Sequence, residues 1–275
     1  MKDIIHFSHA NGFPASTYRT IFAELADDYE IRSVERFGHD PRYPVTRDWP
    51  HLVDELLDDI ASHHRDGERP QVWLVGHSLG GYLSLMAALK RPQWVRGVVM
   101  LDSPVIGGWR SSLLRVSQFT GLDERLSPAA ATKKRRTHWA SRDEAWRHFH
   151  SKPAFARWDE RMLSDYIDYA IPQTGANGAR SLAFEREVEY LVYRTLPHTI
   201  GARLARRAHG RHVPVGFIAG TQSKEVRQVG LGLTRRITGE HFEWIEGSHL
   251  FPMERPIDTA RAVQRMLNAL SGEAA

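Results

Sequence analysis

Short apolar runs and amphipathic helical patterns alternate along most of this 275-residue chain. Runs typical of buried strands lie at 4–8, 30–35, 71–76, 95–102, 213–220 and 240–246. Helical patterns cover 18–26, 49–63, 81–90 and 257–270, and each is short enough to connect two parallel strands. The alternation predicts an α/β fold, a mostly parallel sheet of about six strands with helices on both faces.

The alternation stops after residue 103, and the next hundred residues have helical patterns alone. Ser141 and Glu144 form a capping-box pattern that predicts a helix start, and Pro153 can open a further helix. Two more helical patterns cover 159–170 and 184–193. We therefore expect a helical insertion in the α/β core.

The expected domain boundaries follow from this change of pattern. Residues 1–104 and 212–275 are expected to form the core, and residues 105–211 to form a helical lid. An insertion at this edge of the sheet is well placed to shape a substrate pocket and to exclude water. Its aromatic side chains make an apolar pocket plausible, although most are expected to pack lid helices together: Trp109, Phe119, Trp139, Trp146, Phe149, Trp158 and Tyr166.

Composition is ordinary for a globular protein, with 41% hydrophobic and 25% charged residues. No apolar stretch has the length of a membrane span, and the first residues lead into a strand pattern rather than a signal peptide. We therefore expect a cytoplasmic protein without a membrane partner. The absence of cysteine excludes disulfides, thiolate metal sites and a cysteine nucleophile.

The net charge of +4 and the isoelectric point of about 9.4 raise the question of nucleic-acid binding. Two basic clusters lie at 133–136 and 203–211. Neither has aromatic residues at stacking spacing, so we interpret both as solvated helix faces and expect no nucleic-acid partner. The sequence does not indicate an oligomeric state.

The apolar run 72–76 ends in Gly-His-Ser-Leu-Gly and is followed by a helical pattern. A serine between two glycines at a sharp strand-to-helix turn is typical of a nucleophile elbow. The glycines remove Cβ atoms that would collide there, and the helix N-terminus favours negative charge beside Ser78. Ser78 is the predicted nucleophile; the alternative is an inert serine in a glycine-rich turn.

A serine needs a base that accepts its proton, and histidine has a suitable pKa. Among 15 histidines, His249 follows the last predicted strand and therefore returns to the sheet edge where Ser78 lies. We expect His77 to point away from the site and His9 to shape the loop after the first strand. His249 is the predicted general base.

Two backbone amides are expected to bind the acyl oxygen as it becomes negative. The first is that of Leu79, directly after the nucleophile. The second is expected from the loop 8–14, where Gly12 permits a tight turn and presents the Phe13 amide. We favour Phe13 over Asn11, and the alternative is a turn with no binding role.

A carboxylate should accept the second imidazole N–H. The spacing after the strand 213–220 that normally carries aspartate gives Ser223 here. Asp102 lies at the same sheet edge, one strand beyond the elbow, and is our predicted acid. Glu225, or a serine–histidine dyad with or without a bridging water, is the alternative.

These motifs, taken in order, resemble the α/β-hydrolase superfamily over essentially the whole chain. The loop Ser8-His9-Ala10-Asn11-Gly12-Phe13-Pro14 is similar to its His-Gly-type oxyanion loop, and the serine motif and Gly247-Ser248-His249 complete the match. Asp102 resembles the acid of some haloalkane dehalogenases, whose relatives include epoxide hydrolases. Those enzymes have an aspartate nucleophile, whereas Ser78 points to acyl transfer to water.

The resemblance implies a lidded serine hydrolase that cleaves a carboxylic ester or related small acyl substrate, without a cofactor and without a metal. The same site could serve acyltransfer, perhydrolysis or carbon–carbon bond hydrolysis. A non-catalytic binding module on the same scaffold is the alternative from another class.

Overall fold

The computed structural model describes residues 2–64, 70–107, 132, 135–175, 177–206 and 213–272. Trp109, Phe119, Lys133, Lys134 and residues 207–211, named above, lie outside this part. Within it, the main sheet has the strand order β2-β1-β3-β4-β7-β8, and every pairing is parallel. The strands are β1 (Asp3–Ser8), β2 (Tyr29–Ser33), β3 (Val72–His77), β4 (Val95–Leu101), β7 (Val215–Gly220) and β8 (Phe242–Ile245). The predicted α/β fold is confirmed.

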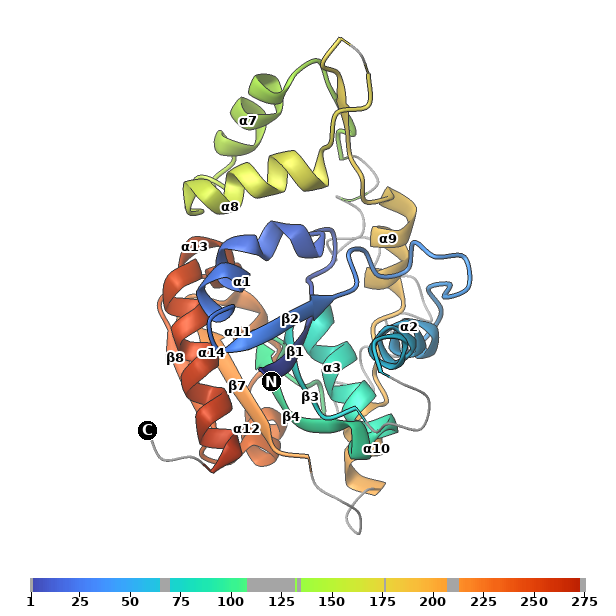
Figure 1. Cartoon of the computed structure of the whole chain (residues 1–275), viewed down its shortest axis with the longest axis vertical. Helices are drawn as coiled ribbons and strands as arrows, with labels where there is room; N and C mark the ends of the chain where they lie inside the picture. Colours follow the sequence, from blue (N-terminus) through green and yellow to red (C-terminus); the bar gives the residue numbers. More distant parts are fainter. Residues whose placement is uncertain are drawn as a thin grey trace.

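Helices cover both faces of the sheet (Figure 1). On one face lie η1 (Ala15–Tyr18), α1 (Arg19–Leu25) and α14 (Pro256–Ser271), and on the other lie α2 (Pro50–Ser62) and α3 (Leu79–Lys90). Shorter elements complete the core: η2 (Pro92–Trp94), α11 (Lys224–Val229), α12 (Gly232–Thr238) and α13 (Phe251–Glu254).

The two faces follow from the alternation of side chains along each strand. In β3, Trp73 and Val75 pack against α1 and α14, whereas Val72 and Leu74 pack against α2 and α3. All six residues of β3 are buried, as expected for a central parallel strand covered on both sides.

The insertion contains three of the expected helical segments, at α7, at α8 with η3 and at α9, and an antiparallel pair of short strands that was not expected. Its elements are β5 (His138–Trp139), α7 (Arg142–His150), α8 (Glu160–Asp165), the π-helix η3 (Tyr166–Ala170), β6 (Arg180–Ser181), α9 (Arg186–Arg194) and α10 (Ile200–Arg206), with β5 and β6 antiparallel. The Ser141 side chain accepts a hydrogen bond from the Glu144 N–H, so this helix start is confirmed.

The prediction that a helix begins at Pro153 is wrong. The chain forms turns at 151–157, where the Phe155 N–H donates to the Lys152 carbonyl. These turns place the Phe155 ring 4.9 Å from that of Phe149 and 4.6 Å from that of Trp158. Aromatic packing therefore prevails over the preference of proline for a first helical turn.

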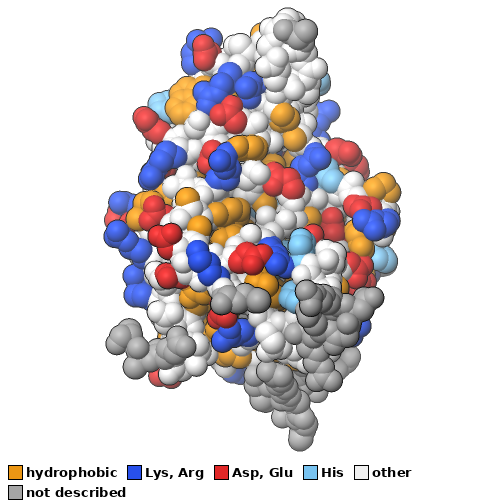
Figure 2. Space-filling model, in the orientation of Figure 1, with side chains coloured by type: hydrophobic (Ala, Val, Ile, Leu, Met, Phe, Trp, Pro, Cys, Tyr) orange, Lys and Arg blue, Asp and Glu red, His pale blue; other side chains and the backbone are white. Residues whose placement is uncertain are grey.

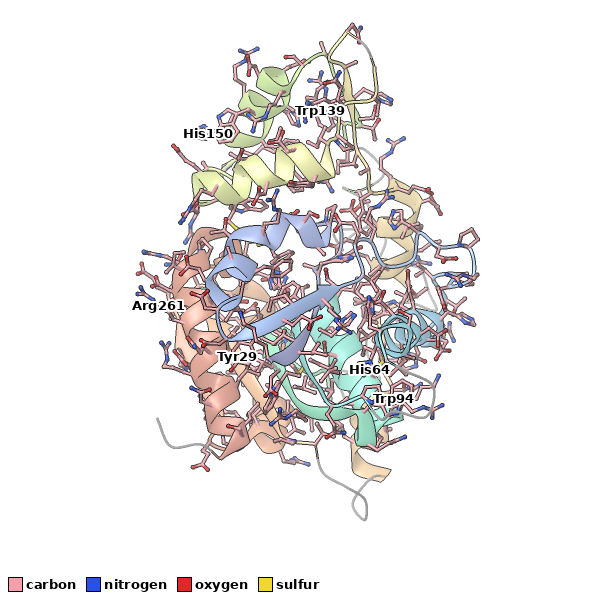
Figure 3. All side chains as sticks on the ribbon, viewed as in Figure 1. Tyr29, His64, Trp94, Trp139, His150 and Arg261 are labelled. Atoms are coloured by element: carbon pink, nitrogen blue, oxygen red, sulfur yellow. The ribbon has the colours of Figure 1, made fainter. Side chains whose placement is uncertain are left out.

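Helix α8 packs on the core, and helix α7 packs on α8 and η3. Helix α8 lies beside α1 (Figure 1). The buried Trp139, labelled near α7 in Figure 3, belongs with Phe149, Met162 and Tyr166 to the hydrophobic cluster that contains Phe7 of β1. The division into a core and a lid stays a prediction.

No helix in the described ranges is long and apolar enough to cross a bilayer. On the face in Figure 2, basic and acidic side chains are interspersed. A cytoplasmic location and the absence of a nucleic-acid partner stay predictions.

We predict that Phe149→Ala lowers the free energy of unfolding by about 3–5 kcal/mol, because it empties a buried aromatic site in this shared cluster. Calorimetry should show one unfolding transition at a lower temperature. The control Trp244→Ala removes an aromatic ring that is 46% exposed and should change stability by about 0.5 kcal/mol or less. Two separate transitions would contradict a shared core.

Candidate active site

Ser78 lies at a strained turn between β3 and α3. Its φ is +54°, in a region that residues other than glycine rarely adopt. A Cβ on Gly76 would lie 2.2 Å from the Gly80 carbonyl group, and one on Gly80 would lie 1.9 Å from the Ser8 carbonyl oxygen. Both positions therefore require glycine, as the motif predicted.

Hydrogen bonds hold the turn at Ser78. Its N–H donates to the Leu101 carbonyl at 3.0 Å, and its own carbonyl accepts from the Ser103 hydroxyl at 2.8 Å. The Leu79 amide occupies the first position of α3, where an N–H has no acceptor within the helix. This amide is thus placed to bind an oxygen beside Ser78.

The structure brings Ser78, His249 and Asp102 into one hydrogen-bonded row. The Ser78 hydroxyl donates to His249 Nε2 over 3.0 Å, and His249 Nδ1–H donates to Asp102 Oδ2 over 2.7 Å. Nδ1 is the protonated ring nitrogen, because an ionised carboxylate can only accept a hydrogen bond. Nε2 therefore retains the lone pair that a general base needs.

Asp102 is buried at the end of β4 with three hydrogen-bond donors around it. Its φ is +47°, and besides His249 it accepts from the Gly220 N–H at 2.8 Å and from the Ser223 hydroxyl. Ser223, at the position where the sequence spacing would place an acid, therefore binds the Asp102 carboxylate. Its hydroxyl also accepts from the Val226 N–H and caps α11.

Glu225, the alternative acid, lies near the same imidazole but does not bind it. Its Oε2 is 3.9 Å from His249 Nδ1, and its side chain is 47% exposed. Burial lowers the pKa of His249, but the hydrogen bond to Asp102 and the negative charges of Glu225 and Asp102 outweigh it and raise that pKa. Glu225 thus acts on His249 through charge alone.

The loop after β1 places its predicted donor in a turn. The Phe13 N–H donates to the Ala10 carbonyl at 3.1 Å, and the Asn11 side chain donates to the Glu189 carbonyl. His9 is buried, where it donates to the Ala10 carbonyl and accepts from the Phe37 N–H, so it shapes this loop as expected. A binding role for the Phe13 amide stays a prediction.

One ion pair beside this loop was not predicted. Arg135, assigned above to a solvated helix face, instead lies largely buried outside any helix and binds Glu189 at 2.8 Å and the Tyr166 hydroxyl. A Cβ on Gly12 would lie 3.0 Å from the Glu189 carboxyl group. The solvated-face interpretation of Arg135 is wrong because the side chain is largely buried against partners on α9 and η3. These partners are distant in sequence, so the local pattern did not indicate them.

Asp102, Glu225 and His249 are also a possible ligand group for a metal, with donor atoms within 4.8 Å of one another. The hydrogen bond between His249 and Asp102 accounts for this proximity.

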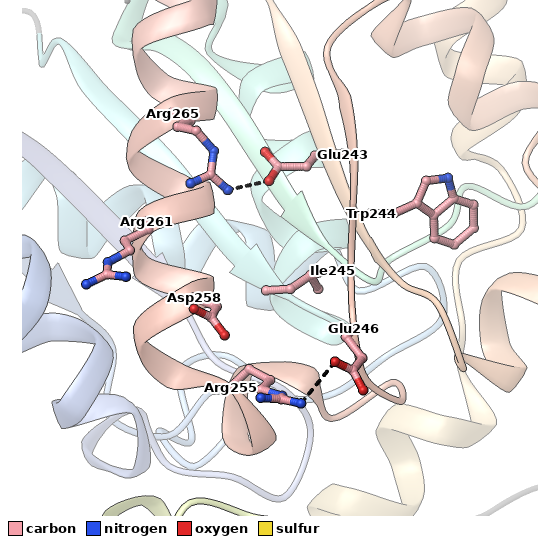
Figure 4. A pocket seen from close by; sticks show the side chains of 8 residues that line it. All are labelled: Glu243, Trp244, Ile245, Glu246, Arg255, Asp258, Arg261 and Arg265. Atoms are coloured by element: carbon pink, nitrogen blue, oxygen red, sulfur yellow. Dashed lines mark hydrogen bonds and ion pairs between the residues drawn. The ribbon is translucent and has the colours of Figure 1, made fainter.

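A separate cleft of about 340 Å³ lies between β8 and α14 (Figure 4). Its charged lining includes the ion pairs Arg265–Glu243 and Arg255–Glu246. None of Ser78, His249 and Asp102 lines it, so the cleft is not part of the candidate site.

We predict that Glu225→Gln lowers the pKa of His249 and that Asp102→Asn lowers it further, because each removes a negative charge and Asp102 also binds the ring. NMR titration of the His249 ring measures both shifts. The control Glu246→Gln removes an exposed carboxylate paired with Arg255 and should leave this pKa unchanged. A larger shift in Glu225→Gln than in Asp102→Asn would contradict the geometry.

A family model described as "Alpha/beta hydrolase family" matches residues 7–262. Monoglyceride lipase of Rattus norvegicus is 29% identical over 109 residues, 38% of this chain and 36% of that protein. The 2-(acetamidomethylene)succinate hydrolase of Mesorhizobium japonicum is 33% identical over 97 residues, 35% of this chain and 34% of that protein. The chain thus matches about a third of the length of these curated relatives.

Among solved structures, that of E-2-(acetamidomethylene)succinate hydrolase superposes with a TM-score of 0.74. The match covers 98% of this chain and 92% of the other, at 18% sequence identity. This likeness shows a shared fold.

Proposed function

Because this chain belongs to the alpha/beta hydrolase family, we propose that it is a serine hydrolase that cleaves a carboxylic ester or related small acyl substrate. The observation that carries the proposal is the row of hydrogen bonds from the Ser78 hydroxyl through His249 to Asp102. The relatives named above support the proposal of a hydrolase, since their names describe a lipase and a hydrolase.

In the proposed reaction, the Ser78 oxygen attacks the acyl carbon while His249 Nε2 takes the hydroxyl proton. The resulting imidazolium is stabilised by Asp102 and gives its proton to the leaving group, which leaves an acyl-serine. Water then attacks this ester with His249 as the base, and proton return to Ser78 releases the carboxylic acid.

The acyl oxygen carries negative charge in both tetrahedral intermediates. We propose that the Leu79 and Phe13 amides bind it, each donor contributing about 3 kcal/mol in the transition state. The Phe13 N–H would then be shared between this oxygen and the Ala10 carbonyl, an arrangement that backbone amides adopt readily. Residues 105–211 would cover the site as a lid.

We predict that a fluorophosphonate probe labels the folded wild type and labels neither Ser78→Ala nor His249→Ala, because the probe needs an activated serine. Gel fluorescence and intact mass measure the labelling. The control Ser62→Ala removes an exposed serine at the end of α2 and should leave labelling unchanged. A folded wild type that resists the probe would instead favour a binding module.

We predict that Asp102→Asn lowers kcat by about 10⁴-fold with little change in folding, since the wrong imidazole tautomer is then favoured. Glu225→Gln, which leaves the short hydrogen bond intact, should lower kcat by less than about 10-fold. Steady-state kinetics on p-nitrophenyl esters of increasing acyl length measure both variants and the acyl preference. If Glu225→Gln has the larger effect, the acid is misassigned.

A further inference from the structure

A second chain of hydrogen bonds lies beneath the proposed catalytic residues. The Ala10 N–H donates to the Tyr18 hydroxyl at 3.1 Å, and this hydroxyl lies 2.8 Å from His77 Nδ1. His77 Nε2 in turn lies 2.9 Å from the His249 carbonyl oxygen. Ala10, Tyr18 and His77 are buried, so water does not compete for these groups.

The chemistry of its two ends fixes the direction of this chain. A backbone N–H at Ala10 can only donate, and a backbone carbonyl at His249 can only accept. The Tyr18 oxygen therefore accepts from Ala10 and directs its own proton to His77 Nδ1. His77 must then carry its proton on Nε2 and donate it to His249.

This arrangement also keeps His77 uncharged. Burial, assisted by the neighbouring His249, lowers the pKa of His77 to about 3. Burial raises the pKa of Tyr18, so its proton stays in place and occupies the one lone pair through which His77 could be protonated. The His77 ring lies 5.2 Å from the His249 ring, where a positive charge would oppose formation of the catalytic imidazolium.

We propose that His77 and Tyr18 are positioning residues that join three parts of the site, an inference that rests on the proposed function. His77 directly precedes Ser78, holds the main chain of His249, and connects through Tyr18 to the loop of the predicted oxyanion donor. The chain thereby sets the distance from His249 Nε2 to the Ser78 hydroxyl.

The oxyanion loop is held at the same residue, Ala10. The Ala10 N–H binds Tyr18, while the Ala10 carbonyl accepts from the Phe13 N–H and from His9 Nδ1–H. A shift of the Ala10 backbone would therefore move the Phe13 amide as well. Misplacement of catalytic groups by about 1 Å costs about 100-fold in rate, so the effect should appear in kcat.

The first test reads the tautomer directly in the wild type. In ¹⁵N-histidine-labelled protein, NMR should show His77 neutral with its proton on Nε2. In Tyr18→Phe, which keeps the ring packed 4.7 Å from Phe7 but loses the proton donor, Nε2 should stay protonated against the His249 carbonyl while the ¹⁵N shift of Nδ1 changes because its hydrogen bond is lost. A His77 that carries its proton on Nδ1 in the wild type would overturn the proposal.

The second test separates positioning from stability. With p-nitrophenyl acetate, Tyr18→Phe and His77→Leu should each lower kcat about 10- to 100-fold and leave KM within about 3-fold. His77→Gln should recover part of the loss, since its amide can donate near the Nε2 position. The Tyr18→Phe/His77→Leu double variant should be no slower than the slower single variant.

The matched control is His6→Gln, because His6 is a buried histidine on the neighbouring strand β1 that binds Asp59 on the other face of the sheet. Its kcat should equal that of the wild type. Rate losses that multiply in the double variant, or a loss confined to KM, would overturn the proposal.

The rate of fluorophosphonate labelling is a second readout and should fall in parallel with kcat. A wild type without labelling or turnover would contradict the proposed function. The NMR tautomer of His77 is a property of the fold, so it would still show whether the hydrogen-bond chain exists.

Discussion

The buried carboxylate of Asp102 is the interaction on which the rest of the site depends. A buried charge is costly unless hydrogen bonds satisfy it, and here donors from Gly220, Ser223 and His249 do so. These donors come from the end of β7, the cap of α11 and the loop after β8. The carboxylate therefore binds both the turn between β7 and α11 and the loop after β8 at the end of β4, and the orientation of the imidazole follows from that.

Backbone strain beside this carboxylate is sustained by the sheet. Ser78 and Asp102 both have positive φ values and directly follow neighbouring parallel strands. Each such residue costs about 1–3 kcal/mol. The Ser78 N–H bonds to Leu101 and the Asp102 N–H to Ile218, so each turn is held by the adjacent strand. The positive φ values of Ser78 and Asp102 thus place both side chains at the same edge of the sheet.

Much of the fold could be predicted because the controlling signals are local. Short apolar runs in strands, helical patterns between them and the glycines around Ser78 each lie within a few residues. The position of His249 beside Ser78 could also be predicted from the sequence, since parallel strands bring their carboxyl ends to one edge of the sheet. Its hydrogen bond to Asp102 rather than Glu225 depends on a distance that sequence spacing does not contain.

The remaining features depend on contacts between distant segments. Arg135 lies among basic residues that suggested a surface, yet its partner Glu189 is 54 positions away. The turns at 151–157 replace the helix expected at Pro153 because Phe155 packs between aromatic rings of the insertion. Neither outcome has a signal in the residues next to it.

The insertion supports the same loop that we propose for binding the acyl oxygen. The Phe13 ring lies 5.7 Å from the rings of both Trp158 and Tyr166, and the Asn11 side chain donates to Glu189 on α9. Since Ala10 joins this loop to His77 through Tyr18, packing in the insertion and the geometry of the hydrogen-bonded row of Ser78, His249 and Asp102 are physically connected. Residues that shape a substrate pocket there would also influence the position of the Phe13 amide.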